Sequence, residues 1–168
     1  NIYEDLLLHF DRVEYFPNKE VVFYNIDAVS GDLRWKRLNV LKSILEEKNK
    51  IVVSSIDAIM NKYTPIETFV KYIKKVAIGD IVDVKNISRW LIEAGYDRVV
   101  TVENKGQFSI RGGIIDIYPP TENYPVRIEL FDDEIDSMRT FNTKTQRSIE
   151  KVFSVKIYPA KEVIIPQE

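Results

Sequence analysis

The chain has 168 residues, of which 45% are hydrophobic and 30% are charged, as is typical of a soluble globular protein. Because its net charge is −2, nonspecific electrostatic binding to nucleic acid is not expected of the whole chain. Cysteine is absent, which excludes disulfide bonds and thiolate metal sites and fits a reducing compartment. No apolar run has the length of a membrane span, and the start of the chain lacks the basic region of a signal peptide. Because the chain starts at Asn1 rather than at methionine, we expect it to be a piece of a longer protein.

The first half of the chain is predicted to alternate helices with short strands, an order that is typical of α/β proteins. The run KIVVSS is continuous and apolar, so we expect a strand that is buried on both faces of a parallel sheet. The expected elements are a helix over 2–10, strands over 13–16 and 21–24, a helix capped by Asp32 and running to Glu47, a strand over 50–55 and a short helix over 56–60.

The second half is predicted to be an antiparallel meander of strands that carries one helix. The helix spans 84–94, and Gly95 follows it as a stop signal. The triplet Asn104-Lys105-Gly106 is expected to form a hairpin turn. The expected strands are 98–103, 107–111, 114–118, 126–131, 135–141 and 151–158. The predicted fold class is therefore a partial α/β domain followed by a small α+β domain with an antiparallel sheet.

Alternation along these strands predicts which side chains face the core and which face outward. The expected core side chains are Phe108, Ile110, Val126, Ile128 and Leu130. The expected outward side chains are Ser109, Arg111, Arg127, Glu129 and Phe131. An ion pair between Arg127 and a carboxylate such as Glu129 would contribute little free energy at such a surface.

Two adjacent glycines, Gly112 and Gly113, follow Arg111 in a stretch that is otherwise typical of strands. Glycine inside a strand marks a bulge, a bend or a close approach by another backbone. We expect a bulge here that restarts the alternation, so that Ile115 and Ile117 point inward and Asp116 points outward. The two glycines are thus predicted to be structural and to set the direction of Arg111.

Phe131 is an aromatic side chain on a face that otherwise carries arginine and carboxylate groups. Two explanations are open. Aromatic residues and arginine are enriched at the centres of protein interfaces, so Phe131 could contact a partner. Alternatively, the helix that begins at Val84 or a neighbouring domain could cover it.

Other candidate sites are weak. His9 is the single histidine, so a metal site there is not expected. Lys71, Lys74 and Lys75 are expected to be solvated. The acids Asp132, Asp133, Glu134 and Asp136 lack the spacing of an EF-hand, and a polar strand connection is the expected role. No phosphate-binding loop and no catalytic constellation occurs, so no enzyme activity, metal or cofactor is expected for this chain.

Long ordered motifs then identify a resemblance. The stretch GQFSIRGGIIDIYPPTENYPVRIELFDDEIDSMRTFNTKTQRSIEKV, followed by YPAKE, closely resembles the UvrB-like N-terminal region of the bacterial transcription-repair coupling factors (the Mfd family). The match is specific over about 95–162. It is looser but consistent back to about residue 14, through YFPNKEVVFY and RLNVLKSILEEKNKIVVSSIDAIM.

The resemblance implies a domain organisation and a function. Residues 1–75 would be the C-terminal part of a degenerate helicase-like α/β domain, 76–160 an α+β domain that binds UvrA, and 161–168 a linker leading out. The resemblance implies a large cytoplasmic protein that recruits UvrA to lesions at stalled RNA polymerase in nucleotide excision repair. This chain would be its non-catalytic module, and the motor and the contacts with RNA polymerase and DNA would lie in other regions. The family's UvrA-contacting positions fall on Arg111, Arg127 and Phe131, and Asp133 matches a further candidate beside them; we add Glu129 from the same predicted face.

Two alternatives remain open. UvrB shares the module in a more distant form and binds DNA and ATP, but its tyrosine-rich hairpin has no counterpart in NIDAVSGDL, the short segment between Tyr24 and Arg34. The UvrA-binding face could also be masked by the C-terminal part of the same protein, as an intramolecular clamp. One surface could serve both UvrA and this clamp.

Overall fold

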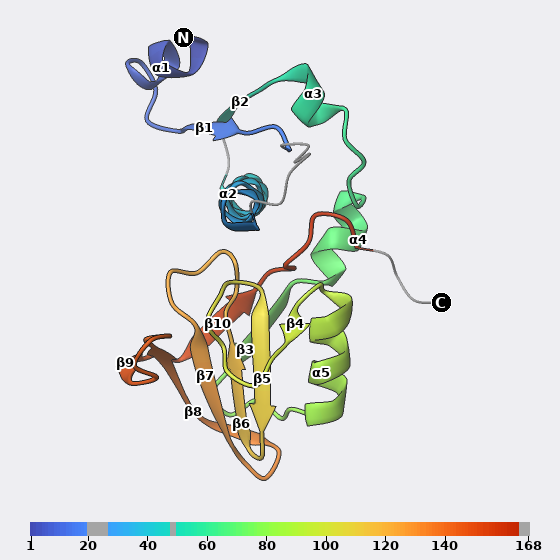
Figure 1. Cartoon of the computed structure of the whole chain (residues 1–168), viewed down its shortest axis with the longest axis vertical. Coiled ribbons are helices and arrows are strands. Elements are labelled where there is room, and N and C mark those ends of the chain that lie inside the picture. Colours follow the sequence, from blue (N-terminus) through green and yellow to red (C-terminus); the bar gives the residue numbers. More distant parts are fainter. Residues whose placement is uncertain (20–26, 48–49, 165–168) are drawn as a thin grey trace. The chain divides into compact units, whose positions relative to one another are not determined.

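The structure is a computed structural model that describes residues 1–19, 27–47 and 50–164. The chain divides into two compact units, Asn1–Tyr63 and Thr64–Glu168 (Figure 1). The strand predicted over 21–24 and the end of the predicted linker lie outside the described residues. Among the helices of the described residues, none combines the length and the apolar character needed to cross a membrane.

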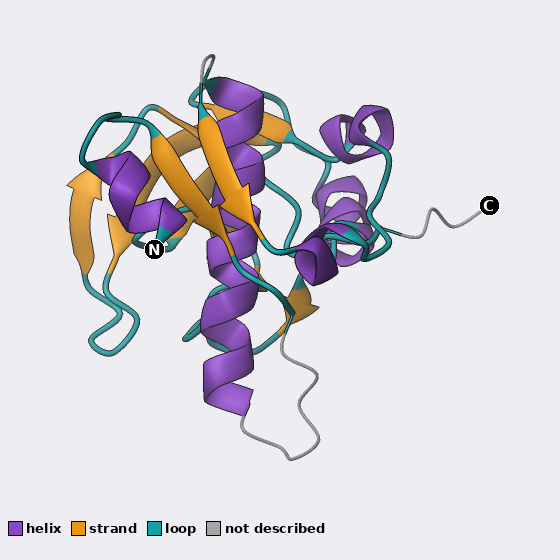
Figure 2. Ribbon diagram, turned by 90° about the horizontal axis from the view of Figure 1, so that it is seen from above, coloured by secondary structure: helices purple, strands orange, loops and turns teal. Residues whose placement is uncertain are grey.

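The first unit is an α/β arrangement around a parallel pair of strands. Strands β1 (Val13–Phe16) and β2 (Ile51–Ser54) pair along their whole length, with Val13 opposite Ile51. Figure 2 shows these two strands side by side over the long helix α2. Phe16, Val40 and Ala58 form a small core between β1, α2 and α3. The elements are α1 (Ile2–Leu7), β1 (Val13–Phe16), α2 (Asp27–Glu46), β2 (Ile51–Ser54) and α3 (Ile56–Ile59).

Two predictions for this unit need correction. Helix α2 begins at Asp27, so Asp32 lies inside the helix and does not cap it. Gly31 lies inside the helix, where it lowers helix propensity without ending the helix. The regular apolar spacing begins only after Gly31, so it indicated a helix start that is too late. The strand over 50–55 is parallel, as predicted, but it is not buried on both faces, since Val52 is 37% exposed. The elements of the described residues that pack against this pair leave part of both strands open, since Tyr15 on β1 is also 48% exposed.

The second unit contains an antiparallel meander, and it confirms the predicted α+β class. Strands β4 to β9 form one sheet in sequential order, and β3 pairs with β10 in a separate antiparallel pair. The elements are α4 (Ile66–Lys71), β3 (Lys74–Ala77), α5 (Val84–Glu93), β4 (Asp97–Arg98), β5 (Gln107–Arg111), β6 (Ile114–Ile117), β7 (Val126–Phe131), β8 (Glu134–Phe141), β9 (Ser148–Lys151) and β10 (Ser154–Ile157).

Helix α5 lies along the large sheet and covers one of its faces (Figure 1). The Asp83 carboxylate caps it by accepting hydrogen bonds from the amides of Lys85 and Asn86, at 2.8 and 3.0 Å. Gly95 adopts a φ of +89° directly after it, as a C-terminal stop requires. The core between helix and sheet contains Ile87, Leu91, Phe108, Ile115, Ile117, Ile128 and Met138. The opposite face of the sheet is therefore free to carry polar side chains.

The predicted hairpin turn at Asn104-Lys105-Gly106 is wrong. Strand β4 has two residues and pairs with β5 in parallel, with Asp97 opposite Gln107. The Gln107 side chain accepts hydrogen bonds from the amides of Glu103 and Asn104. These bonds fix the loop before β5, where the predicted strand would have paired with β5. The strand predicted over 151–158 is observed as the shorter β10, which pairs with β3 and does not continue the large sheet, and β9 was not predicted apart from its last residue, Lys151. Sequence analysis missed α4 and β3.

Candidate protein-interaction surface on the outer face of the sheet

Gly112 and Gly113 form the turn of a hairpin and are not the predicted bulge. Arg111 pairs directly with Ile114, so the two glycines are the two-residue connection between β5 and β6. Gly112 has a φ of +58°, whereas Gly113 has no positive φ. Among two-residue hairpin turns, the type II′ turn has a positive φ at its first residue only, and glycine is favoured at that position. The turn ends β5 at Arg111 and places this arginine at the rim of the sheet.

Gly113 meets a second constraint, the close approach of another backbone. Its carbonyl oxygen accepts a hydrogen bond of 2.7 Å from the Leu130 amide. A Cβ atom at Gly113 would lie 3.1 Å from the Leu130 carbonyl oxygen, which belongs to backbone and cannot rotate away. The turn is thereby held against β7, the strand that carries Arg127 and Phe131.

A row of directly opposed residues crosses the outer face from β5 to β8. Ser109 lies opposite Asp116, Asp116 opposite Arg127, and Arg127 opposite Arg139. Side chains of paired residues share a face and lie within reach of one another. The register therefore brings together one carboxylate and two arginines from strands that are separate in the sequence.

Asp116 is the centre of this row, although strand alternation predicted only a solvent-facing acid. Its carboxylate accepts a hydrogen bond from Arg111 Nη2 at 2.9 Å. Arg127 Nε and Nη2 also donate to it, at 2.7 and 2.9 Å. Asp116 points to the predicted face, but it is only 1% exposed because the two guanidinium groups cover it. The prediction that it meets solvent is wrong, and sequence patterns gave no sign of its bridging role.

The bridge fixes both guanidinium groups. Two parallel bonds from one guanidinium to one carboxylate are the strongest arrangement available to such a pair. The hydrogen bonds with Asp116 raise the pKa of Arg127 above its usual value, so this side chain is a permanent cation. Arg127 also stacks on the Phe141 ring, 4.6 Å from its centre. The Arg127 side chain is 17% exposed and that of Arg111 is 49% exposed, so Arg111 presents more of its surface to a partner.

Ser109 was also predicted to face solvent, and this prediction is wrong. It lies on the outer face, but it is 1% exposed. Its hydroxyl donates a hydrogen bond of 2.9 Å to the Val100 carbonyl oxygen. The loop between β4 and β5 thus covers the outer face at its β5 edge, and the accessible part of the face begins at Arg111.

Phe131 is 75% exposed, which shows that α5 does not cover it. It is the last residue of β7 and pairs with Glu134 across a two-residue turn. Asp132 in this turn has a φ of +55°. Asp133, the other turn residue, is exposed, and its carbonyl oxygen accepts a hydrogen bond of 2.7 Å from the Val82 amide. Phe131 therefore projects at the end of the sheet, with Asp133 two positions away and outside the strand.

Glu129 lies between the arginines and Phe131, and it does not pair with Arg127. Its carboxylate accepts hydrogen bonds from Ser137 Oγ at 2.8 Å and from Arg139 Nη2 at 3.2 Å. The side chain is about one-third exposed. We define the outer face by Arg111, Asp116, Arg127, Glu129, Phe131 and Arg139, of which sequence analysis missed the role of Asp116 and did not select Arg139.

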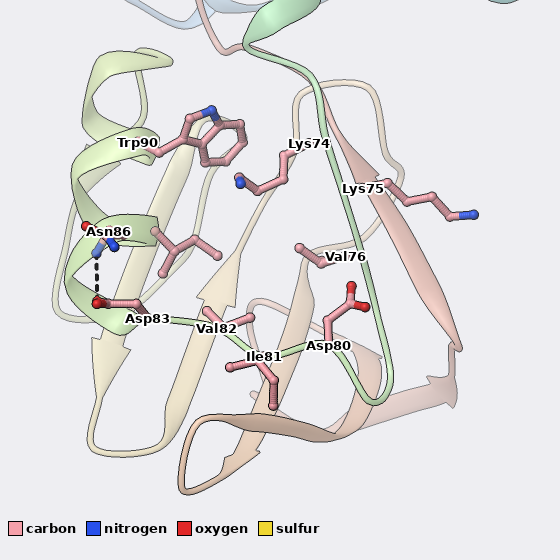
Figure 3. A pocket seen from close by; sticks show the side chains of 10 residues that line it. Lys74, Lys75, Val76, Asp80, Ile81, Val82, Asp83, Asn86 and Trp90 are labelled. Carbon is pink, nitrogen blue, oxygen red and sulfur yellow. Dashed lines mark hydrogen bonds between the residues drawn. The ribbon is translucent and has the colours of Figure 1, made fainter.

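Apart from Glu134, which lies opposite Phe131, the remaining sequence candidates do not join this face. His9 is exposed just after α1. Within the described residues, no group of histidine and acidic side chains is arranged to hold a metal ion, and this includes Asp132, Asp133, Glu134 and Asp136. Lys74 and Lys75 line a pocket of about 620 Å³ between β3 and α5, where the Lys74 ammonium lies 5.5 Å from the centre of the Trp90 ring (Figure 3).

A small α+β domain with arginines and an exposed aromatic on an open sheet face has the composition that is enriched at protein interfaces, so its features fit the class of protein-interaction domains. Residues 75–163 match the family described as UvrB interaction domain, and the chain belongs to this family. The match begins near the predicted start of the second domain, and the predicted boundary itself stays a prediction.

Comparison with curated proteins confirms the resemblance drawn from the sequence. The chain is similar to the transcription-repair-coupling factor of Bacillus subtilis (strain 168), with 42% identity over 96% of the chain. The proteins of the same name from Staphylococcus aureus (strain USA300) and Staphylococcus haemolyticus (strain JCSC1435) are 34% and 32% identical over 98% and 100% of the chain. The chain spans 14 to 15% of the length of these relatives.

Proposed function

We propose that this chain is the non-catalytic module through which a transcription-repair coupling factor recruits UvrA during nucleotide excision repair, at lesions where RNA polymerase has stalled. The family match and the names of the relatives support this proposal. The single observation that carries it is the outer face, where Asp116 holds Arg111 and Arg127 side by side, close to the exposed Phe131. In the longer protein, RNA polymerase and DNA would be contacted through other regions.

The chemistry of the face indicates what a partner must supply. Arg111 Nε and Nη1 and Arg127 Nη1 make no hydrogen bond within the described residues, so they remain as donors. Guanidinium groups with free donors recognise carboxylates, so the contacting surface of UvrA should be acidic. Phe131 would fill an apolar pocket of UvrA, and the exclusion of water there would strengthen the neighbouring charge-assisted hydrogen bonds.

Each of the other predicted site residues has a role in this proposal. Glu129 keeps Arg139 extended along the face, and Asp133 offers a carboxylate at the turn beside Phe131. Gly112 and Gly113 position Arg111 through the hairpin turn. The C-terminal part of the longer protein would compete for the same surface if it masks the module.

Co-elution of the purified chain with UvrA on a sizing column tests the proposal. We expect a complex with UvrA and no measurable nucleotide turnover by the chain alone. We also expect DNA binding no stronger than nonspecific contacts at physiological salt. Separate elution of the two proteins at micromolar concentration, or nucleotide turnover by the chain, would contradict this function.

A further inference from the structure

Arg139 is a third arginine of the outer face. It lies on β8 directly opposite Arg127, and the two side chains point to the same side of the sheet. The Arg139 side chain is 31% exposed. The register between β7 and β8 brings it within reach of any partner that contacts Arg127.

The surroundings of Arg139 are unfavourable in the isolated domain. Like charges directly opposite each other destabilise a pair of strands. Arg139 Nη2 donates to Glu129 Oε2 at 3.2 Å and to Ser137 Oγ at 3.3 Å, which are long hydrogen bonds for a charged pair. Arg139 Nε is buried and has no hydrogen-bond partner among the described residues. A buried donor without a partner costs free energy, so Arg139 contributes little to stability.

The charge of the outer face also favours a role of Arg139 in binding rather than in stability. Asp116 is already shared between Arg111 and Arg127, and Glu129 bonds to Arg139. Lys151 lies opposite Arg139 on β9, and the exposed Glu134 lies opposite Phe131 at the end of the face. Three arginines and one lysine therefore face three carboxylates, although the whole chain carries a net charge of −2. A local excess of positive charge steers and selects a partner with the opposite charge.

We propose that Arg139 contacts the partner and takes an acidic side chain from it, beside the carboxylates recognised by Arg111 and Arg127. The partner would thus present a row of acidic groups along the line from β5 to β8. Approach of this row offsets the repulsion between Arg127 and Arg139. This inference rests on the proposed function, because it adds a residue to the same UvrA-binding surface.

Titration of UvrA with the Arg139→Gln variant tests this inference. Glutamine keeps most of the side-chain stem and can still bond to Glu129, but it removes the charge. We expect affinity to fall roughly tenfold and to depend less steeply on salt. The melting temperature should be unchanged or higher, because the like-charge pair is removed. A purely structural role would lower the melting temperature without changing the salt dependence.

Two further variants make the outcome decisive. Arg89→Gln changes an exposed arginine on α5, which covers the opposite face, and should bind as the wild type does. Arg127→Ala should weaken binding and so serves as the reference for the proposed function. If the wild type binds, Arg127→Ala weakens binding and Arg139→Gln leaves it unchanged, this inference is overturned while the proposed function stands. If the wild type itself does not bind UvrA, the proposed function fails.

Should Arg139→Gln melt well below the wild type, Arg139→Met replaces it in the same titration. Methionine packs along the strand without a polar group. Wild-type affinity of a folded Arg139→Met variant would overturn the inference, and a loss like that expected for Arg139→Gln would support it.

Discussion

Arg127 on β7 and Asp116 on β6 lie directly opposite each other and share two hydrogen bonds, of 2.7 and 2.9 Å. Asp116 also accepts a hydrogen bond from Arg111, so one buried carboxylate orients two arginines. A side chain that is already ordered loses less conformational entropy when it binds. Under the proposed function, the two arginines are therefore already ordered before UvrA binds.

Replacement of Asp116 by alanine should weaken both folding and binding. The change leaves Arg127, whose side chain is only 17% exposed, without its carboxylate and places two cations side by side. We expect the free energy of unfolding to fall by about 2 kcal/mol, which is typical when a hydrogen-bonded charged partner is removed. Urea unfolding measures this loss, and a free energy of unfolding equal to that of the wild type would show that the bridge does not stabilise the domain.

The Gly113→Val variant should be less stable than the wild type. A branched side chain would press on the Leu130 carbonyl oxygen, which already lies 3.1 Å from the position of a Cβ atom. We expect a lower melting temperature, with a loss of about 1–3 kcal/mol from this crowding. Gly112→Asn is the comparison variant, because no atom lies within 4 Å of its Cβ position, so any loss there comes from the positive φ and not from crowding, and it should be smaller than the loss for Gly113→Val. Equal melting temperatures for wild type and Gly113→Val would contradict the close approach.

Tyr96 should make stability fall at alkaline pH. Burial raises the pKa of this phenol well above its usual value of 10.0, and its hydroxyl donates to the Tyr158 carbonyl oxygen at 2.6 Å. Because the unfolded chain loses the proton first, stability is complete below about pH 10 and falls above it, by up to about 1.4 kcal/mol per pH unit. Burial also raises the pKa of Tyr118, which adds a fall in the same direction.

The Tyr96→Phe variant isolates this effect. It should be about 1 kcal/mol less stable than the wild type at neutral pH, since one hydrogen bond is lost. Between about pH 9 and about pH 11 its free energy of unfolding should decline less steeply than that of the wild type. Identical slopes in urea unfolding experiments over this range would show that the Tyr96 proton is not linked to folding.

Local patterns were sufficient to predict much of the second unit. Strand β7 has the predicted bounds, and α5 begins at the predicted Val84 because Asp83 caps it. Alternation also placed Arg127 and Phe131 on the outer face, because strand geometry depends only on local spacing. The resemblance to known proteins selected the same residues by a separate route.

Other features depend on pairing between distant segments, which one sequence does not reveal. The glycines after Arg111 fit both a bulge and a turn, and the pairing of Arg111 with Ile114 decides between them. Asp116 becomes a buried bridge only when β5, β6 and β7 are in register. The short β4 runs parallel to β5, a pairing that the hairpin rule for neighbouring strands excludes. The partner of Arg139 across the sheet depends on register in the same way.

The affinity of Arg111→Ala for UvrA, compared with that of the wild type by titration calorimetry, tests the central claim most directly. The Arg111 side chain is 49% exposed and makes one hydrogen bond to Asp116, which keeps its two hydrogen bonds from Arg127, so the removal of Arg111 should lower the free energy of unfolding by about 1 kcal/mol, less than the loss expected for Asp116→Ala. Binding should weaken by about 2–4 kcal/mol, as at an interface hot spot, and Arg127→Ala and Phe131→Ala should lose binding on the same scale. Wild-type affinity of a folded Arg111→Ala variant, together with wild-type affinity of the other two, would show that UvrA does not bind this face.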